Sequence, residues 1–297
     1  MSDTDPFNLL GHFNSLLSAE EIRETYIRAP FGWPGGKSRS IANILPHLPY
    51  RDAYIEPFGG SGVILLNRNE SKLEVFNDKF SGVVVFYRCI RDKEKLQRFI
   101  ERLELCLHSR EEFIWSLKTW KDCEDEIERA ARWYYSVIMS FGQQSRNFGR
   151  SIRGKPQQGA KLKNVLPTFP ELHARLQNVQ IENLDWRLCL KDFDHEQAVF
   201  YIDPPYYAYN KGQYEFEMHK DEHYELLARI HELKGFVALS GYHNELYDCS
   251  QWKWDGRHSW RVHTSQLSMA RQETNNLIGL ERSRDKAEEI LWIKEAW

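Results

Sequence analysis

The stretch AVFYIDPPY, residues 198–206, carries the pattern that decides the fold. Five apolar, strand-forming residues end abruptly at an aspartate that is followed by two prolines. Two earlier stretches end in a similar way: AYIEPF (53–58) contains the carboxylate of Glu56, and LEVFND (73–78) ends on Asp78. Short apolar runs of this kind, separated by loops and helical stretches, favour a parallel sheet with crossover helices.

The remaining elements follow from the same periodicities. Between about 89 and 178 long helical stretches dominate, followed from 141 to 165 by a polar, glycine-containing loop, so we expect a mostly helical insertion in the sheet domain. Further strands are predicted at 179–183, 235–240, 261–268 and 288–295. Helices are predicted at 18–27, 40–48, 63–69, 79–91, 93–107, 110–120, 124–140 and 219–234.

Composition narrows the class of protein. The chain has 297 residues, 41% of them hydrophobic, which is enough for a large core, and its net charge of −3 does not indicate a nucleic-acid binder as a whole. The five cysteines are scattered without a CxxC pair, which argues against a zinc site or a disulfide framework. No apolar run approaches the roughly 20 residues of a membrane span, and the first ten residues lack a signal region, so we expect a cytoplasmic protein.

Asp203, Pro204, Pro205 and Tyr206 form the motif with the clearest chemistry. A carboxylate at the carboxyl end of a parallel strand lies where α/β proteins bind ligands. The prolines fix the backbone and leave carbonyls free, so Asp203 and the Pro204 carbonyl could accept both hydrogens of an aromatic amino group. That would direct the nitrogen lone pair at an electrophile, with Tyr206 as a stacking face. A plain proline turn is the alternative for this tetrapeptide taken alone.

A glycine-rich loop follows the strand at 53–58. Glycines permit a tight strand-to-helix turn and a close approach of a ligand to the backbone, although this loop lacks the dinucleotide pattern GxGxxG. After the next strand, Asp78 could accept the ribose hydroxyls of an adenosine, the alternative being a helix cap. The loop consists of Glu56, Pro57, Phe58, Gly59, Gly60, Ser61 and Gly62.

The stretch WPGGKS (33–38) invites comparison with a phosphate-binding loop. That motif needs four residues between its first glycine and Gly-Lys-Ser, whereas three separate Gly32 from Gly36, and no apolar strand precedes them. An NTPase is therefore disfavoured. Lys37 beside two glycines could instead meet the carboxylate of an amino-acid ligand, with Trp33 packing on it.

In their order along the chain, these motifs resemble the N6-adenine-specific DNA methyltransferases of the DNA adenine methyltransferase type, the D12 class. Family members begin with an aromatic-x-Gly-Gly-Lys motif, here Trp33 to Lys37, and continue with a cofactor loop, here Glu56 to Gly62, often with another residue in place of Gly59. Asp78 matches the acidic residue after the second strand, and a helical insertion precedes the motif at 203–206. The resemblance covers roughly residues 30–297.

The resemblance implies a Rossmann-like methyltransferase sheet with helices on both faces and a helical target-recognition insertion. It implies S-adenosylmethionine as cofactor, double-stranded DNA as partner, no metal, a monomer, and methyl transfer to adenine N6 by base flipping and in-line displacement. The expected parts are an extension (1–29), a catalytic domain (30–88 and 179–297) and a recognition domain (89–178). Expected cofactor contacts are Trp33, Gly35, Gly36, Lys37, Glu56, Phe58, Gly59, Gly60, Ser61, Gly62, Asp78, Asp185, Trp186 and Asp203, with plain core packing as the alternative for Trp186.

The segment 143–163 contains several basic residues and no acidic one. Within a chain of negative net charge, this composition indicates a local surface for DNA phosphates or base edges, a solvated basic loop being the alternative. The candidate DNA-binding residues are Arg146, Asn147, Arg150, Arg153, Lys155, Lys161 and Lys163.

Two other functions remain open. N4-cytosine methylation needs the same amino-group acceptors, although such enzymes usually carry Ser in place of Asp203. A non-catalytic DNA-binding relative is the rival of another class, and the intact motif at 203–206, together with Lys37 and Asp78, argues against it.

Overall fold

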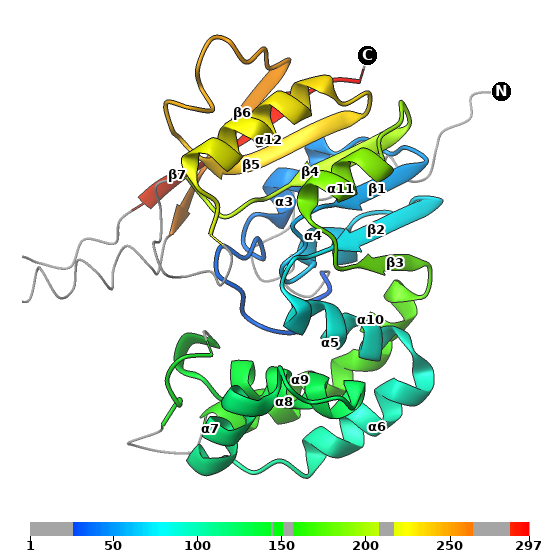
Figure 1. Cartoon of the computed structure of the whole chain (residues 1–297), viewed down its shortest axis with the longest axis vertical. Coiled ribbons are helices and arrows are strands. Elements are labelled where there is room, and N and C mark those ends of the chain that lie inside the picture. Colours follow the sequence, from blue (N-terminus) through cyan, green and yellow to red (C-terminus); the bar gives the residue numbers. More distant parts are fainter. Residues whose placement is uncertain (1–25, 144, 151–156, 208–216, 264–285, 297) are drawn as a thin grey trace, which may run out of the picture.

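In the computed structural model the strands form one sheet of mixed direction (Figure 1). The structure describes residues 26–143, 145–150, 157–207, 217–263 and 286–296, and within them seven strands lie in the order β3-β2-β1-β4-β5-β7-β6. The strands from β3 to β5 in this order run parallel to one another, whereas β7 is antiparallel to both β5 and β6. The α/β fold predicted from the sequence is thereby confirmed. The strands are β1 Ala53–Glu56, β2 Leu73–Asn77, β3 Val179–Glu182, β4 Ala198–Ile202, β5 Phe236–Tyr242, β6 Gly256–His263 and β7 Lys286–Lys294.

The strand order reverses between β1 and β4, and this reversal positions the site. Every residue of these two strands is buried, which explains why both are continuously apolar until their carboxyl ends. Ile55 of β1 pairs with Val75 of β2 on one side and with Phe200 of β4 on the other. Open α/β sheets bind ligands outside the carboxyl ends of strands at such a reversal, so Glu56 and Asp203 end their strands at the expected place.

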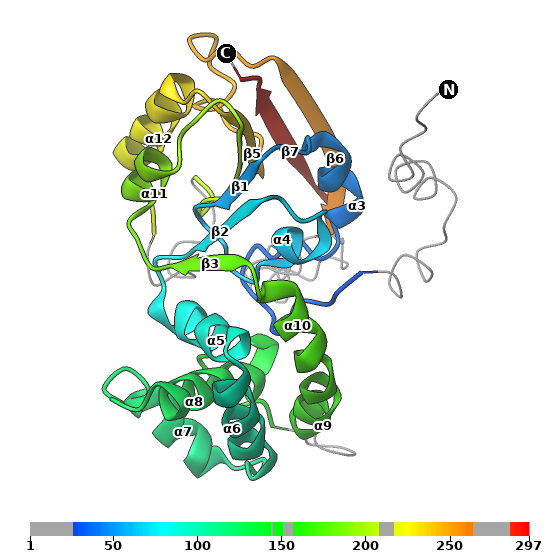
Figure 2. The same cartoon turned by 90° about the vertical axis from the view of Figure 1, so that its right-hand side faces the viewer.

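Helices cover both faces of the sheet (Figure 2). On one face, α11 (Trp186–Asp192) and α12 (Lys220–Glu232) pack on side chains such as those of Ile55, Phe200 and Trp292. On the other, α3 (Ile41–Ile44), α4 (Val63–Asn67) and α5 (Ser81–Arg91) share one apolar cluster with the helices that follow α5. The predicted placement of helices on both faces is confirmed.

Between α5 and β3, the described residues form five further α-helices. The starts of three of them follow from capping, because Asp92, Ser109 and Asp125 each accept a hydrogen bond from a backbone amide in the first turn. Aromatic packing joins this helical layer to α5, where the rings of Phe86 and Tyr134 stack with centroids 4.9 Å apart. These helices are α6 Lys93–Glu104, α7 Arg110–Thr119, α8 Glu126–Ile138, α9 Gln157–Val165 and α10 Phe169–Leu176.

Part of the predicted polar loop at 141–165 is wrong, because residues 157–165 form α9. Gln158, Leu162 and Leu166 are buried, and their spacing of four residues places them on one face of the helical segment. The prediction weighted the glycines and charges of this segment above that periodicity.

Other boundaries also differ from the prediction. The helix expected at 40–48 divides into α3 and a 3₁₀ turn, Leu45–His47, at Pro46. The strand expected at 261–268 begins earlier, at Gly256, and its residues beyond His263 lie outside the described part of the chain, as do residues 18–25 of the first expected helix. Helix α11 was not predicted. The division into three parts, with the helical insertion at 89–178, stays a prediction.

Candidate functional site

A cavity of about 890 Å³ lies between the carboxyl ends of the parallel strands and the helical layer. Its volume falls within the range of small-molecule sites. Residues of α7 and α8, including Leu117 and Trp133, form its helical wall. The predicted site residues that line it are Trp33, Gly36, Lys37, Glu56, Phe58, Gly59, Gly60, Ser61, Asp78, Arg146, Asp185, Trp186, Asp203, Pro204 and Pro205. Gly35, Gly62 and Tyr206 lie behind this lining.

The glycine-rich loop forms the floor under Trp33. Gly60 has a φ of +52°, a left-handed conformation that side chains rarely adopt, and a Cβ at this position would lie 2.7 Å from Cδ1 of Trp33. Two motifs that are far apart in the sequence are therefore in contact. The close approach of the Trp33 ring explains why glycine is needed at position 60.

Asp78 holds this loop in place from the end of β2. Its Oδ2 accepts a hydrogen bond of 2.8 Å from the Gly60 amide, and its Oδ1 accepts one of 2.7 Å from the Phe80 amide. Burial raises the pKa of Asp78 to about 6, although both amide bonds lower it. Each carboxylate oxygen has a second lone pair, so Asp78 can still accept a hydroxyl hydrogen from a ligand in the cavity.

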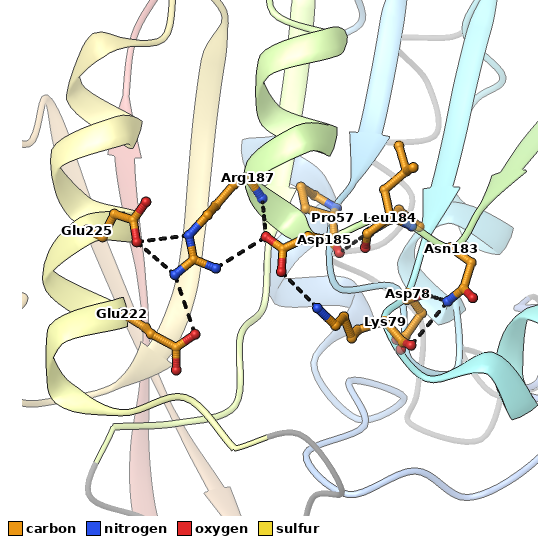
Figure 3. Close-up of polar contacts among 10 residues, drawn as sticks. Pro57, Asp78, Lys79, Asn183, Leu184, Asp185, Arg187, Glu222 and Glu225 are labelled. Carbon is orange, nitrogen blue, oxygen red and sulfur yellow. Dashed lines mark hydrogen bonds and ion pairs between the residues drawn. The ribbon is translucent and has the colours of Figure 1, made fainter.

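Amide side chains join the loops that follow β1, β2 and β3 (Figure 3). Asn77 donates to the Pro57 carbonyl at 2.8 Å and accepts from the Leu184 amide at 2.7 Å, and Asn183 donates to the Asp78 carbonyl at 2.7 Å. Three loops from separate parts of the sequence thus form one rigid rim. The sequence indicated only a polar pair at the end of β2.

Asp185 lies on the same rim (Figure 3), and Trp186, the next residue, begins α11. Asp185 caps the helix through the Arg187 amide and forms an ion pair of 2.8 Å with Lys79. Partial burial raises the pKa of Asp185, but the hydrogen bonds from Lys79 and Arg187 outweigh it and lower the pKa below its ordinary value. Arg187 is in turn held by Glu225 at 2.7 Å. Trp186 is 5% exposed and belongs to the apolar core while lining the cavity, so both interpretations of it are compatible with the structure.

Asp203 lies directly after β4 and is held by Lys37. The Lys37 ammonium donates to both oxygens of Asp203, at 2.6 and 2.5 Å, and to the Gly35 carbonyl at 2.8 Å. Burial raises the pKa of Asp203 to about 6; Lys37 lowers it and Glu289 raises it. The sequence analysis predicted that Lys37 contacts the carboxylate of a ligand, and this role stays a prediction. In the structure Lys37 contacts the carboxylates of Asp203 and Glu289.

Glu56 is a second buried carboxylate in the cavity wall. It is 2% exposed and accepts a hydrogen bond of 2.7 Å from the Tyr54 hydroxyl. Burial raises the pKa of Glu56 to about 8, so its carboxyl group is protonated at neutral pH.

Tyr206 points away from the cavity lining. Its hydroxyl donates to Glu289 at 2.8 Å, and its ring packs edge-on against Tyr242 with centroids 4.6 Å apart. The Lys37 ammonium lies 4.9 Å from the centroid of the same ring. In this arrangement Tyr206 supports Lys37 and Glu289, and its stacking on a base stays a prediction.

Sequence reasoning missed Glu289 altogether. Glu289 is 4% exposed and lies 3.3 Å from the Lys37 ammonium. The signal was available, because successive side chains of a strand point to opposite faces, so Glu289 shares one sheet face with Leu291 and Ile293 of the apolar cluster. A carboxylate on a buried strand face indicates a specific partner.

The structure places only some of the candidate DNA-binding residues. Arg146 is exposed and reaches the cavity wall from a turn in which Gly142, Gln143 and Ser145 all have positive φ. Among the described candidates, Arg146 alone lines the cavity. The others divide into Asn147 and Arg150, exposed after the turn, Lys161 and Lys163, exposed on α9, and Arg153 and Lys155, which lie outside the described residues.

The described residues contain neither a metal-binding group of side chains nor a membrane-spanning helix. No group of three or more His, Cys, Asp or Glu side chains there could hold a metal ion. No helix in that part of the chain is long and apolar enough to cross a membrane.

Two known proteins are similar in sequence to this chain. The DNA adenine methylases of Salmonella typhi and of Salmonella typhimurium (strain LT2) are each 26% identical to the chain over 195 residues. These matches cover 60% of the chain and 65% of each relative, so the chain spans just under two thirds of their length. Residues 33–251, which include every residue that lines the cavity but not Glu289 of β7, match the D12 class of N6 adenine-specific DNA methyltransferases, and the chain belongs to that family.

Proposed function

We propose that the chain transfers a methyl group from S-adenosylmethionine to the N6 amino group of adenine in double-stranded DNA. The observation that carries this proposal is the position of Asp203 and Pro204 in the wall of a cavity at the reversal of the strand order. Family membership supports the choice of adenine. Because the relatives are matched over 65% of their length, the activity and the substrate are proposals for this chain.

The residues of the cavity fit S-adenosylmethionine. Asp78 offers carboxylate lone pairs to ribose hydroxyls, and Phe58 and Trp186 offer aromatic surface, with ring centroids 6.3 Å apart. The left-handed Gly60 lets a ligand approach the backbone without a side chain in the way. When bound, S-adenosylmethionine would supply an electrophilic methyl group. Asp78, Phe58, Gly60 and Trp186 would hold it.

Asp203 and the Pro204 carbonyl would then activate the amino group. With its pKa near 6, Asp203 is ionised at neutral pH and acts as a hydrogen-bond acceptor, which an amino group requires. The fixed backbone of Pro204 and Pro205 holds the two acceptors in one geometry, so that little reorganisation is needed during the reaction. The new N–C bond would form as the bond between the methyl group and the sulfonium sulfur breaks, leaving S-adenosylhomocysteine, and the proton lost from N6 would pass to the Asp203 carboxylate.

Adenine inside a duplex cannot reach a cavity of this depth, so we infer that the base is flipped out of the helix, at a cost of a few kcal/mol. Arg146 on the cavity wall places a positive charge where the flipped strand would enter. Helices α6–α10 would then form the recognition part, with Arg150, Lys161 and Lys163 as exposed phosphate contacts.

The test is transfer of tritium from labelled S-adenosylmethionine to unmethylated duplex DNA, followed by digestion to nucleosides. Asp203→Asn keeps the side-chain shape but removes the charge, and we expect it to lower the rate by about 10²–10³-fold. Asp192→Asn is the matched control, because Asp192 is exposed at the end of α11 outside the cavity lining. Label in N4-methylcytosine would overturn the choice of base. Cofactor binding without transfer by the unmodified protein would overturn the activity.

A further inference from the structure

The buried carboxylate of Glu289 contacts four polar side chains. Its Oε1 accepts hydrogen bonds from the Tyr206 hydroxyl at 2.8 Å and the Ser240 hydroxyl at 3.2 Å, and lies 3.3 Å from the Lys37 ammonium. Its Oε2 accepts from the Ser40 hydroxyl at 3.1 Å. These four partners come from three separate parts of the fold, the turn before α3, the segment after β4 and strand β5, and they fix the carboxylate in one orientation.

The framework extends one step beyond these partners. Ser40 precedes α3, and its hydroxyl also accepts a hydrogen bond of 3.0 Å from the Trp260 indole of β6. The Ser40 hydroxyl that donates to Glu289 is therefore itself fixed by a hydrogen bond from Trp260. Burying a charge in this way costs free energy unless a cation is paired with it, and Lys37 is the cation beside it.

The position of Lys37 creates a conflict with the proposed reaction. Lys37 contacts both oxygens of Asp203, at 2.6 and 2.5 Å, and is itself 4% exposed. An amino group that donates to Asp203 needs one of these oxygens in a favourable direction. Each oxygen keeps a second lone pair, but an ammonium held to both fixes the direction of the carboxylate, so the amino group binds in its best direction if Lys37 loosens one contact. A buried ammonium that does so needs another anion beside it.

We infer that Glu289 is a positioning residue that serves as the second counter-ion of Lys37 and lets Lys37 release one oxygen of Asp203 to the amino group of the substrate. This inference rests on the proposed function. A shift of less than one ångström would bring the Lys37–Glu289 contact, now 3.3 Å, to the length of a charge-assisted hydrogen bond of about 2.8 Å. Tyr206 acts in the same arrangement by orienting Glu289 through its hydroxyl.

Glu56, the other buried carboxylate of the cavity wall, does not fit this role. Its hydrogen bond from Tyr54 and its pKa of about 8 leave it neutral at pH 7, so it offers Lys37 no charge. The titratable groups that act on the pKa of Asp203 are Lys37 from the turn before α3, Glu289 from β7 and Tyr206 from the segment after β4.

The test compares Glu289→Gln with Glu288→Gln. The two residues are adjacent on β7, but Glu288 is exposed and bonds to Ser259 on the opposite face. We expect Glu289→Gln to lower the single-turnover rate by roughly 10- to 100-fold, the range seen when a group that orients a functional side chain is removed. Cofactor affinity should stay within about threefold, and Glu288→Gln should match the unmodified protein.

A double-variant cycle distinguishes action through Lys37 from a general structural effect. In a Lys37→Met background, Glu289→Gln should cause less than about a threefold further loss, because the group it serves is already absent. Full losses that multiply, or a rate for Glu289→Gln within threefold of the unmodified protein, would overturn the inference.

A second measurement needs no methyl transfer and so separates this inference from the proposed function. Asp203 is titrated by carboxyl ¹³C NMR, with its resonance assigned through Asp203→Asn. Removing the negative charge of Glu289 should lower the pKa of Asp203 in Glu289→Gln, whereas Glu289→Asp, which keeps the charge, should leave it raised. An Asp203 pKa that is the same in the Glu289→Gln and unmodified proteins would overturn the inference even if the protein methylates DNA.

Discussion

The contact between Gly59 and Phe76 allows a sharp test of how the glycine-rich loop after β1 is built. The backbone of Gly59 has an ordinary φ, so alanine at this position meets no conformational strain. A Cβ there would nevertheless lie 2.2 Å from Cε2 of Phe76 and 2.6 Å from its Cζ, distances that real contacts essentially never show. Phe76 is 1% exposed and packs on Tyr87, with ring centroids 4.6 Å apart, so its ring cannot move aside freely.

Overpacking of this kind costs about 1–3 kcal/mol. For a chain of this size each kcal/mol lowers the melting temperature by about 2–4 °C, so we expect Gly59→Ala to lower it by about 2–12 °C. Unfolding in urea gives the free energy, and scanning calorimetry gives the melting temperature. Gly159→Ala is the control: a Cβ there meets nothing closer than 3.8 Å, and alanine in helix α9 should stabilise the protein by about 0.5–1 kcal/mol.

Phe76→Leu identifies the cause of the destabilisation, because it removes the ring atoms that the new methyl group would meet. In a Phe76→Leu background, Gly59→Ala should cost clearly less than in the unmodified protein. If Gly59→Ala were as stable as the Gly159→Ala control, or if its cost did not depend on Phe76, the steric reasoning would be refuted.

Three further predictions concern other charges. Glu74 is 1% exposed and pairs with Arg175 at 2.5 Å and Arg68 at 3.4 Å. Glu74→Gln removes this counter-charge from the buried Arg68 and the half-buried Arg175 and should lower the free energy of unfolding in urea by about 3–5 kcal/mol. The pKa of Glu56 is raised from 4.5 to about 8, so the folded state binds more protons than the unfolded state between these values and loses stability as pH rises through them; the stability of Glu56→Gln relative to the unmodified protein should therefore increase from pH 5 to pH 8, and a constant difference would contradict this. Arg146→Ala should weaken DNA binding in fluorescence anisotropy and reduce the slope of log affinity against log salt by about 0.9, with cofactor affinity unchanged; an unaltered slope would remove Arg146 from the phosphate contacts.

Most of the fold could be predicted from local sequence, because β1, β2 and β4 are apolar runs that end at a polar residue or a glycine-rich loop. Burial on both faces requires β4 to be apolar throughout, and the first polar residue after it, Asp203, marks its end. The same logic placed Asp78 after β2 and the glycine loop after β1. These inferences need only neighbouring residues, which explains why they were confirmed.

The pairing of charges within the site was beyond local sequence. Lys37 and Asp203 are separated by 166 positions, and the contact between Ser40 and Glu289 spans 249. The motifs predicted that Lys37 and Asp203 belong to one site. They did not predict that Lys37 would also contact Glu289 of β7. Tyr206 shows the same limit, because its motif predicted a stacking face, while its hydroxyl is held by a strand far along the chain.

The antiparallel strand β7 lies between β5 and β6, although β6 precedes it in the sequence (Figure 1). During synthesis β5 and β6 leave the ribosome first and must wait, with unpaired edges, for the strand that joins them. Unpaired strand edges of this kind promote aggregation, so we expect the chain to aggregate most readily before β7, which begins at residue 286, has joined the sheet. Since Glu289 arrives on that same strand, a nascent chain has Asp203 but not Glu289 as a counter-ion of Lys37 until the sheet is closed, and the proposed methyl transfer should appear only once β7 has been inserted.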